Sequence, residues 1–221
     1  RILHRKRDYP GAEKWWLEAK TIVETNFGKE HPDYLKHLYS LANLYSDIRD
    51  YKTAEPLHLE VKAILEKTTG KENDAYASCL FNLGNLYYSI HDYGKAEAFH
   101  LESLSIREKV LGKQHRFYGH SLNSLGILYQ EMGEYEKAEP YFIQAGMVQE
   151  KNQGKISADY ARTLNNLGAL YNNMARYEKA SSVLLECLSI REKVLGKDTP
   201  EYFATLSNLG NVYLWMGDFE I

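Results

Sequence analysis

Apolar residues recur along the chain in paired stretches, each with the spacing of an amphipathic helix. The stretch before a break at Gly133-Glu134 places large apolar side chains three and four positions apart, at Leu122, Leu125, Leu128 and Tyr129. A second stretch with the same spacing follows the break, from Ala138 to Val148. This spacing is typical of a helix with one buried face, and no strand-like alternation competes with it. The pattern therefore predicts an all-α chain built from helix pairs.

The helix pairs repeat with a period of 42 residues. Three columns at this spacing hold 15 of the 18 tyrosines. The columns are Tyr34, Tyr76, Tyr118, Tyr160 and Tyr202; Tyr45, Tyr87, Tyr129, Tyr171 and Tyr213; and Tyr9, Tyr51, Tyr93, Tyr135 and Tyr177, the last continuing as Phe219. The segment LSIREKVLGK also occurs at 104–113 and again at 188–197, two periods later. This register predicts a solenoid, in which each repeat buries its apolar face against its neighbours.

We expect a single array over residues 1–221. It divides into four full repeats with a partial repeat at each end. The full repeats are 31–72, 73–114, 115–156 and 157–198, and the partial repeats are 1–30 and 199–221. Because the pattern begins and stops inside a repeat, we expect a fragment of a longer chain. Apolar helix faces at its cut ends would favour weak self-association.

Helix boundaries carry their own signals. Asn73, Ser157 and Thr199 are suited to cap helix N-termini, and Pro32 and Pro200 suit a first helical turn. Glycines recur just past each second helix, where a left-handed residue commonly ends a helix. They are Gly28, Gly70, Gly112, Gly154 and Gly196.

Small residues recur where the two helices of a repeat must approach closely. One column lies in the first helices: Ala42, Gly84, Gly126, Gly168 and Gly210. The other lies in the second helices: Ala12, Ala54, Ala96, Ala138 and Ala180. A larger side chain would push the helices apart, and overpacking typically costs about 1–3 kcal/mol.

The repeated motifs resemble the tetratricopeptide repeat. They read Leu-x-x-Leu-Gly-x-x-Tyr and then Asp-Tyr-x-x-Ala-Glu, as at Leu80 to Tyr87 and Asp92 to Glu97. The 42-residue form, with HPDY, TLNNLGALY and REKVLGK, resembles the repeats of kinesin light chains. The tyrosine-rich segment GEYEKAEPYF is similar to bacterial arrays, some of which are fused to caspase-like CHAT peptidase domains. The resemblance implies a right-handed superhelical solenoid of antiparallel helix pairs, whose concave groove binds protein or peptide ligands.

Composition and charge limit the classes of partner that we expect. No apolar run approaches the roughly 18 residues that a membrane span needs. A net charge of -3 gives no general attraction to nucleic acid, and Asp47 and Glu131 interrupt any basic stripe along the groove. Two cysteines, Cys79 and Cys187, cannot build a disulfide framework, which favours a cytoplasmic protein. We therefore expect no membrane and no nucleic acid among its partners.

No constellation of residues predicts catalysis, a metal or a cofactor. The repeated Gly-Lys pairs lack the context of a phosphate loop and are better explained as helix ends. Cys187 and the column of His58 and His100 occupy packing positions, the histidines as partly buried rings. A Cys–His pair distant in sequence stays open for Cys79. We predict a protein that is not an enzyme and has no small-molecule substrate.

The predicted binding surface lies on the first helices. The resemblance implies that polar and aromatic residues between the packing positions face the groove. They are Tyr39, Asn43, Phe81, Asn82, Asn85, Tyr88, Asn123, Arg162, Asn165, Asn166, Asn208 and Asn211. An asparagine amide offers a donor and an acceptor to a ligand backbone, and aromatics are enriched at binding hot spots. The lysine-based clamp of chaperone-docking arrays is missing, because its column reads Tyr39, Phe81, Asn123, Asn165 and Ser207.

Two questions stay open from the sequence. The asparagines either bind ligand or link neighbouring repeats to each other. The whole array is either a protein- or peptide-binding scaffold or, alternatively, the regulatory or sensor arm of a larger enzyme such as a CHAT peptidase. The reading frame beside the array would distinguish a binding scaffold from the arm of an enzyme.

Overall fold

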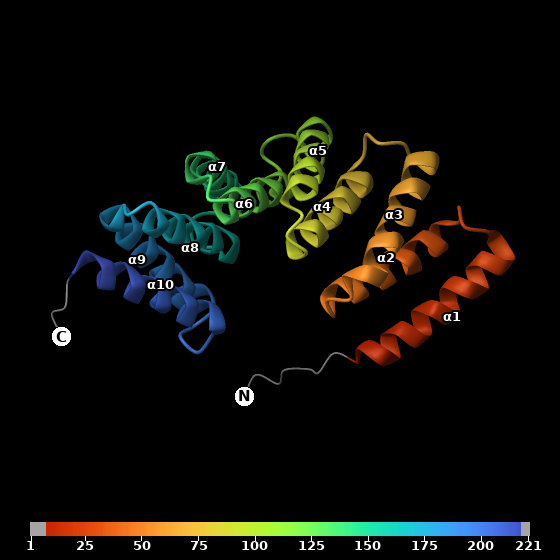
Figure 1. Cartoon of the computed structure of the whole chain (residues 1–221), viewed down its shortest axis with the longest axis horizontal. Coiled ribbons are helices and arrows are strands. Elements are labelled where there is room, and N and C mark those ends of the chain that lie inside the picture. The colour runs from red at the N-terminus through yellow and green to blue at the C-terminus, as the bar shows by residue number, and fades with distance from the viewer. Residues whose placement is uncertain (1–7, 218–221) are drawn as a thin grey trace. The chain divides into compact units, whose positions relative to one another are not determined.

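The computed structural model describes residues 8–217, and within this range the chain forms ten helices and no strand (Figure 1). The helices are α1 (Tyr9–Phe27), α2 (Pro32–Asp47), α3 (Tyr51–Thr68), α4 (Asp74–Ser89), α5 (Tyr93–Leu111), α6 (Arg116–Glu131), α7 (Tyr135–Gln153), α8 (Ala158–Asn173), α9 (Tyr177–Val194) and α10 (Pro200–Met216). The all-α prediction is confirmed. Phe219 and the predicted ends of the outer partial repeats lie outside the described residues.

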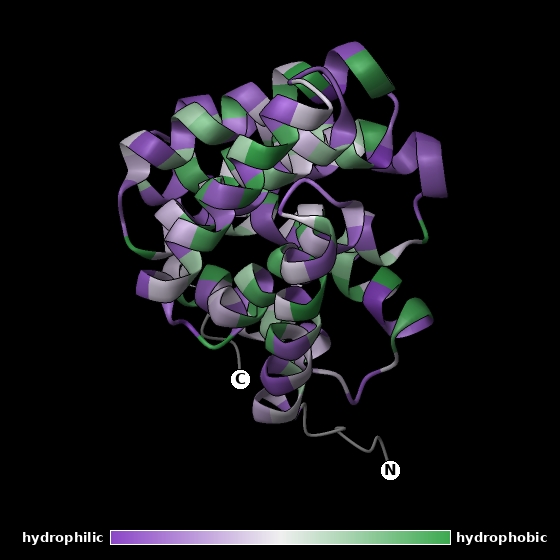
Figure 2. Ribbon diagram, turned by 90° about the vertical axis from the view of Figure 1, so that its right-hand side faces the viewer, coloured by the Kyte–Doolittle hydropathy of each residue, from purple (hydrophilic) through white to green (hydrophobic). Residues whose placement is uncertain are grey.

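The chain forms two compact units, one up to Ile106 and one from Arg107, so that the division falls inside α5. In the first unit α2 packs on α3, and in the second unit α6 packs on α7 and α8 on α9. We call α2, α4, α6, α8 and α10 the first helices and α1, α3, α5, α7 and α9 the second helices. Hydrophobic residues form interrupted bands along individual helices, as one-sided burial requires (Figure 2).

The predicted N-caps of the first helices are present. The side chains of Asn73, Ser157 and Thr199 each accept a hydrogen bond from the backbone N–H three residues later. His31 and His115 fill the same position in α2 and α6, where the ring Nδ1 accepts from the N–H two residues later, at 3.3 and 3.2 Å. The histidine caps were not expected, because histidine is not among the favoured N-cap residues.

The glycines that follow the second helices all have positive φ, from 76° to 84°. The positive φ agrees with the predicted left-handed conformation. The ψ angles of two of these glycines do not. Gly28 has ψ 172° and Gly154 has ψ 168°, a backbone region that is open essentially only to glycine. The chain leaves these helices extended, and any other residue there would be strained.

The turn that follows each first helix also needs a positive φ. The residues are Arg49 (63°), His91 (62°), Gly133 (75°), Ala175 (53°) and Gly217 (78°), at the 42-residue spacing. Arg49, His91 and Ala175 therefore hold a conformation that disfavours side chains with a Cβ.

Replacement of Ala175 by glycine should stabilise the protein. Ala175→Gly relieves the left-handed backbone strain, which costs about 1–2 kcal/mol. Glycine loses more backbone entropy on folding, which offsets part of this gain. The free energy of unfolding should therefore rise by about 0.5–1 kcal/mol. Urea denaturation measures it. Gly133→Ala in the same turn of the preceding helix pair is the reverse substitution and should destabilise; equal effects of both changes would contradict the assignment.

Small residues allow close approach within each helix pair. A Cβ added at Gly84 would lie 2.7 Å from the His100 ring, and one at Gly126 would lie 2.7 Å from the Phe142 ring. At Gly168 the nearest Leu184 atom would be 2.4 Å away. The matching alanines Ala54, Ala96, Ala138 and Ala180 are fully buried. The predicted close approach is therefore present at these positions. It is not seen at Gly210, where a Cβ would meet nothing within 4 Å among the described residues, and Ala12 is only partly buried.

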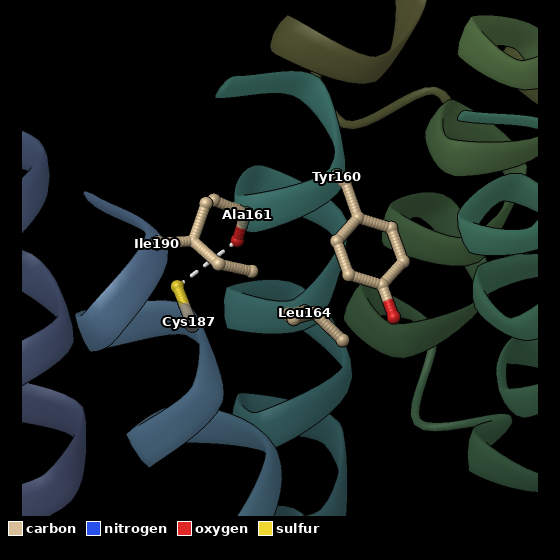
Figure 3. Close-up of a cluster of buried hydrophobic side chains, with 5 residues drawn as sticks. All are labelled: Tyr160, Ala161, Leu164, Cys187 and Ile190. Atoms are coloured by element: carbon tan, nitrogen blue, oxygen red, sulfur yellow. Dashed lines mark hydrogen bonds between the residues drawn. The ribbon is translucent and has the colours of Figure 1, made fainter. Parts of the chain in front are cut away.

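Both cysteines are buried packing residues, Cys187 within a helix pair and Cys79 between neighbouring pairs. Cys187 lies in a buried cluster with Tyr160, Ala161, Leu164 and Ile190, and its thiol donates to the Ala161 carbonyl at 3.0 Å (Figure 3). Burial raises the pKa of this thiol above its usual value. The buried Cys79 thiol contacts the backbone carbonyl of His58 at 3.5 Å, and burial raises its pKa to about 12. Such thiols are poorly suited to act as nucleophiles.

Candidate binding surface of the first helices

The asparagines of the first unit connect α2 to α4. The two amide hydrogens of Asn82 are donated to the Tyr39 hydroxyl and to Asn43 Oδ1, both at 2.8 Å. All three residues belong to the predicted groove set. Because its N–H groups are engaged, Asn82 retains only its Oδ1 for another partner.

The second unit repeats this link between first helices. Asn166 on α8 donates to Asn123 Oδ1 on α6 at 3.2 Å, and Asn208 on α10 donates to Asn165 Oδ1 on α8 at 3.2 Å. Asn123 is only 5% exposed and also accepts from the Thr163 hydroxyl. Each amide donates toward the preceding first helix, which is the arrangement that linkage between repeats requires.

A polar hollow of about 430 Å³ lies between α2, α3 and α4. It is lined by Asn43, Asn82 and Asn85 of the predicted set, together with Ser46, Asp47 and Ser89. Tyr51 and His58 of α3 complete much of the wall. The sequence analysis placed Asp47 along the groove but counted none of these last five residues among the binding residues, although all five lie near the predicted columns or in the neighbouring helix.

Tyr39 lies in a second, mostly apolar hollow of about 280 Å³ in the same unit. Pro32, Leu35 and Val61 also line it, with Lys36 as its one charged side chain among the described lining residues. Phe81 instead packs edge-on against the buried His100 ring, with centroids 5.3 Å apart, and Tyr88 lies beside Tyr93. The predicted aromatic residues therefore divide between an apolar hollow and packing contacts.

Arg162 belongs to an ion cluster in the second unit. Its guanidinium donates to Asp159 at 2.8 Å, and Arg116, His120 and Gln153 contact the same carboxylate. Burial acts to raise the pKa of Asp159, but hydrogen bonds from Gln153 and His120 and the nearby arginine charge hold it below its usual value. Asn211 is exposed on α10.

Two buried arginines were missed in the sequence analysis. Arg107 and Arg191 are 4% and 5% exposed. Arg107 donates to the Ser121 hydroxyl at 2.8 Å and Arg191 to the Thr205 hydroxyl at 2.6 Å, each joining a second helix to the next first helix. The sequence feature that could have indicated them is the arginine in the segment LSIREKVLGK, which occurs twice. The same column holds Leu65 and Gln149 in the other repeats.

His58 is a packing residue, as predicted, but it is fully rather than partly buried. It is 0% exposed, and its Nε2 lies 3.1 Å from the Ser46 hydroxyl oxygen. Burial lowers its pKa to about 4, so the ring is neutral at pH 7. Over residues 8–217, no three His, Cys, Asp or Glu side chains gather closely enough to hold a metal ion. In the same range, no helix has the length and apolar character required to cross a membrane.

The tetratricopeptide repeat family model matches residues 1–67, 38–109, 76–145 and 159–221. A comparison with curated proteins found no match. Among solved structures, BtubC (BKLC) from P. vanneervenii is similar with a TM-score of 0.81 and 24% identity, over 97% of this chain and 85% of that chain. A putative kinesin light chain with nearly identical repeats from Podosopora anserina has a TM-score of 0.71 and 21% identity, over 85% and 89% of the two chains.

A third solved structure, YrrB, is described as a repeat protein of this type with an unusual peptide-binding site. It has a TM-score of 0.52 and 16% identity, over 90% of this chain and 92% of its own. At these identities the solved structures establish the fold, and the family model matches most of the sequence. The chain belongs to the tetratricopeptide repeat family, and its structural neighbours include kinesin-light-chain-like members.

Proposed function

We propose that the chain is a non-catalytic scaffold that binds an extended protein or peptide segment along the exposed side of its first helices. The proposed contact set is the one predicted from sequence apart from the buried Asn123, with Asn43, Asn82 and Asn85 at its centre in the first unit. We further propose a cytoplasmic location, with no cofactor, small-molecule substrate, nucleic acid or membrane as a partner. A regulatory arm of a larger enzyme would use the same surface and differs only in the neighbouring domain.

The polar hollow of the first unit is the observation that supports this proposal best. Three predicted groove residues from two different first helices line one recess of about 430 Å³. Grooves of repeat proteins are the surfaces on which they bind extended ligands. Asn82 is held in place by its two hydrogen bonds to α2, so its acceptor oxygen is preorganised for a ligand.

The test separates ligand binding from repeat linkage. Peptides selected from a random display library on the intact chain serve as probes, and each variant is measured for both affinity and melting temperature. Asn85 is exposed in the hollow, so Asn85→Ala should weaken binding with little change in stability. Loss of a hydrogen bond in a complex is worth about 1–3 kcal/mol, or roughly five- to 150-fold in affinity.

Asn166→Ala and Asn208→Ala remove links between first helices and should lower the melting temperature as well. Lys52→Ala, exposed on α3, is the control and should change neither quantity. Selected peptides that bind all four variants equally well would show that they do not use this surface, and the proposal would be wrong.

A further inference from the structure

Arg162 is the charged residue of the predicted contact set, and it belongs to a cluster at the start of two first helices. Arg116 is the first residue of α6 and His120 follows one turn later, while Asp159 and Arg162 lie near the start of α8. Hydrogen bonds to the Asp159 carboxylate bring the four side chains together. The proposed function leaves this cluster of the second unit without a ligand.

Asp159 is one carboxylate shared by two arginines. Arg162 donates to its Oδ1 at 2.8 Å and Arg116 to its Oδ2 at 3.4 Å. Within residues 8–217, neither arginine forms an ion pair with another carboxylate, that of Glu201 at the matching place of the next repeat included. Burial lowers the pKa of His120 below its usual value, so the ring is neutral at pH 7. The cluster therefore carries an excess of positive charge.

The arginines also retain most of their hydrogen-bond donors. A guanidinium has five N–H groups, and each arginine donates one of them to Asp159. The carboxylate itself is well occupied, because it also accepts from His120 and Gln153. The side chains of Arg116 and Arg162 are 53% and 49% exposed, against 15% for Asp159. The remaining donors are therefore accessible to a ligand, whereas the carboxylate is largely covered.

The surroundings add positive potential. The first turn of α6 holds no acidic residue, and that of α8 holds only Asp159. Helix N-termini carry partial positive charge, and the cluster lies at two of them. Glu150, near the end of α7, pairs with Lys155 at 3.7 Å, so that lysine matches its charge.

We propose that this cluster binds a phosphorylated serine or threonine side chain of the bound segment, through Arg116 and Arg162. This inference rests on the proposed function and specifies a ligand for the second unit. A phosphoryl group carries a charge of about −1.5 to −2 at pH 7 and three acceptor oxygens. Each guanidinium can present a planar pair of donors to two of those oxygens. A glutamate carboxylate has one charge and two oxygens, so it would engage the two arginines less fully.

The experiment titrates the intact chain with Nα-acetyl-phosphoserine methylamide at pH 7, where the phosphoryl group is mostly a dianion. The side-chain Nε–H signals of Arg116 and Arg162 are followed by NMR. We expect saturable shifts with a dissociation constant of about 1 mM, a weak but measurable affinity. The glutamate and unphosphorylated serine analogues should bind at least about tenfold more weakly, because they bring less charge and fewer acceptor oxygens.

Three variants should change the affinity in different directions. Arg162→Ala should weaken phosphoserine binding about tenfold, since one of the two guanidinium contacts is lost. Asp159→Asn should tighten it about fivefold, because it removes the carboxylate that competes for both arginines. Arg176→Ala is the matched control and should leave binding unchanged, because Arg176 lies in the same unit but pairs with its own carboxylate, Glu139, at 2.8 Å. Urea denaturation checks that each variant is folded during the titration.

Glutamate binding as tight as phosphoserine binding, an unchanged affinity in Arg162→Ala, or no tightening in Asp159→Asn would overturn the inference. Library peptides that bind the first helices, but gain no affinity when a serine is phosphorylated, would overturn it while leaving the proposed function intact. Saturable phosphoserine binding at the cluster without any peptide binding would support the anion site and refute the proposed function.

Discussion

Gly126→Ala is expected to lower the free energy of unfolding by about 1–3 kcal/mol, the usual range for overpacking a close helix contact. The added methyl group would lie 2.7 to 3.0 Å from three ring carbons of Phe142. Phe142 is 0% exposed, so the ring cannot move aside without displacing its neighbours. Thermal or urea denaturation measures the loss, which corresponds to a lower melting temperature by about 2–4 °C per kcal/mol for a chain of this size.

Gly210→Ala is the matched control, because Gly210 has the same place in its repeat. Within residues 8–217, a Cβ added there would meet no atom of another helix within 4 Å. Alanine is favoured over glycine inside a helix by about 0.5–1 kcal/mol, so this change should stabilise the protein. The same glycine-to-alanine substitution should thus change the stability in opposite directions at two positions of one column. Destabilisation of similar size at both positions would show that helix–helix distance is not the cause.

Acidification should destabilise the fold through His58. Its pKa is about 4 in the folded chain, against an ordinary value of 6.5. The unfolded chain therefore binds the proton more readily, and the stabilising contribution is complete above pH 6.5 and is lost as the pH falls from 6.5 to about 4. One pKa unit corresponds to about 1.4 kcal/mol, so the loss from this one group is about 3 kcal/mol.

The double variant Ala42→Gly/His58→Phe isolates that contribution. It introduces the residue pair found at Gly126 and Phe142, two repeats later in the same columns. The difference in unfolding free energy between pH 7 and pH 4 should be smaller in the double variant by about 3 kcal/mol. A pH dependence identical to that of the unaltered chain would mean that the His58 ring is protonated in the folded state.

The fold could be predicted because the repeat supplies many independent signals for one structure. The tyrosine columns, the cap residues such as Asn73 and the small residue at Gly126 each indicate the same helix pairs, and each is local in sequence. The two helix-ending glycines with ψ near 170° show where this fails. A glycine in the sequence predicts freedom of φ, but ψ is set by the path of the following loop.

The binding surface was less predictable, since the same residue type serves two roles. Asn82 and Asn85 lie one turn apart on α4, yet Asn82 is tied to α2 while Asn85 is exposed in the hollow. The choice depends on which residue faces the preceding first helix, a tertiary relation. Arg107 was missed for a similar reason, because only the packed structure shows a charged group buried against Ser121.

The close contacts within helix pairs also bear on how the gene can change length. Each glycine packs against a different residue within its own repeat: Gly84 against His100, Gly126 against Phe142 and Gly168 against Leu184. A recombination event that cut between the two helices of a repeat would join unmatched partners and damage the contact. A crossover in the loops that contain Gly70 or Gly154 would leave every pair intact. Duplication and deletion are therefore tolerated best in whole steps of 42 residues, with breakpoints in those loops.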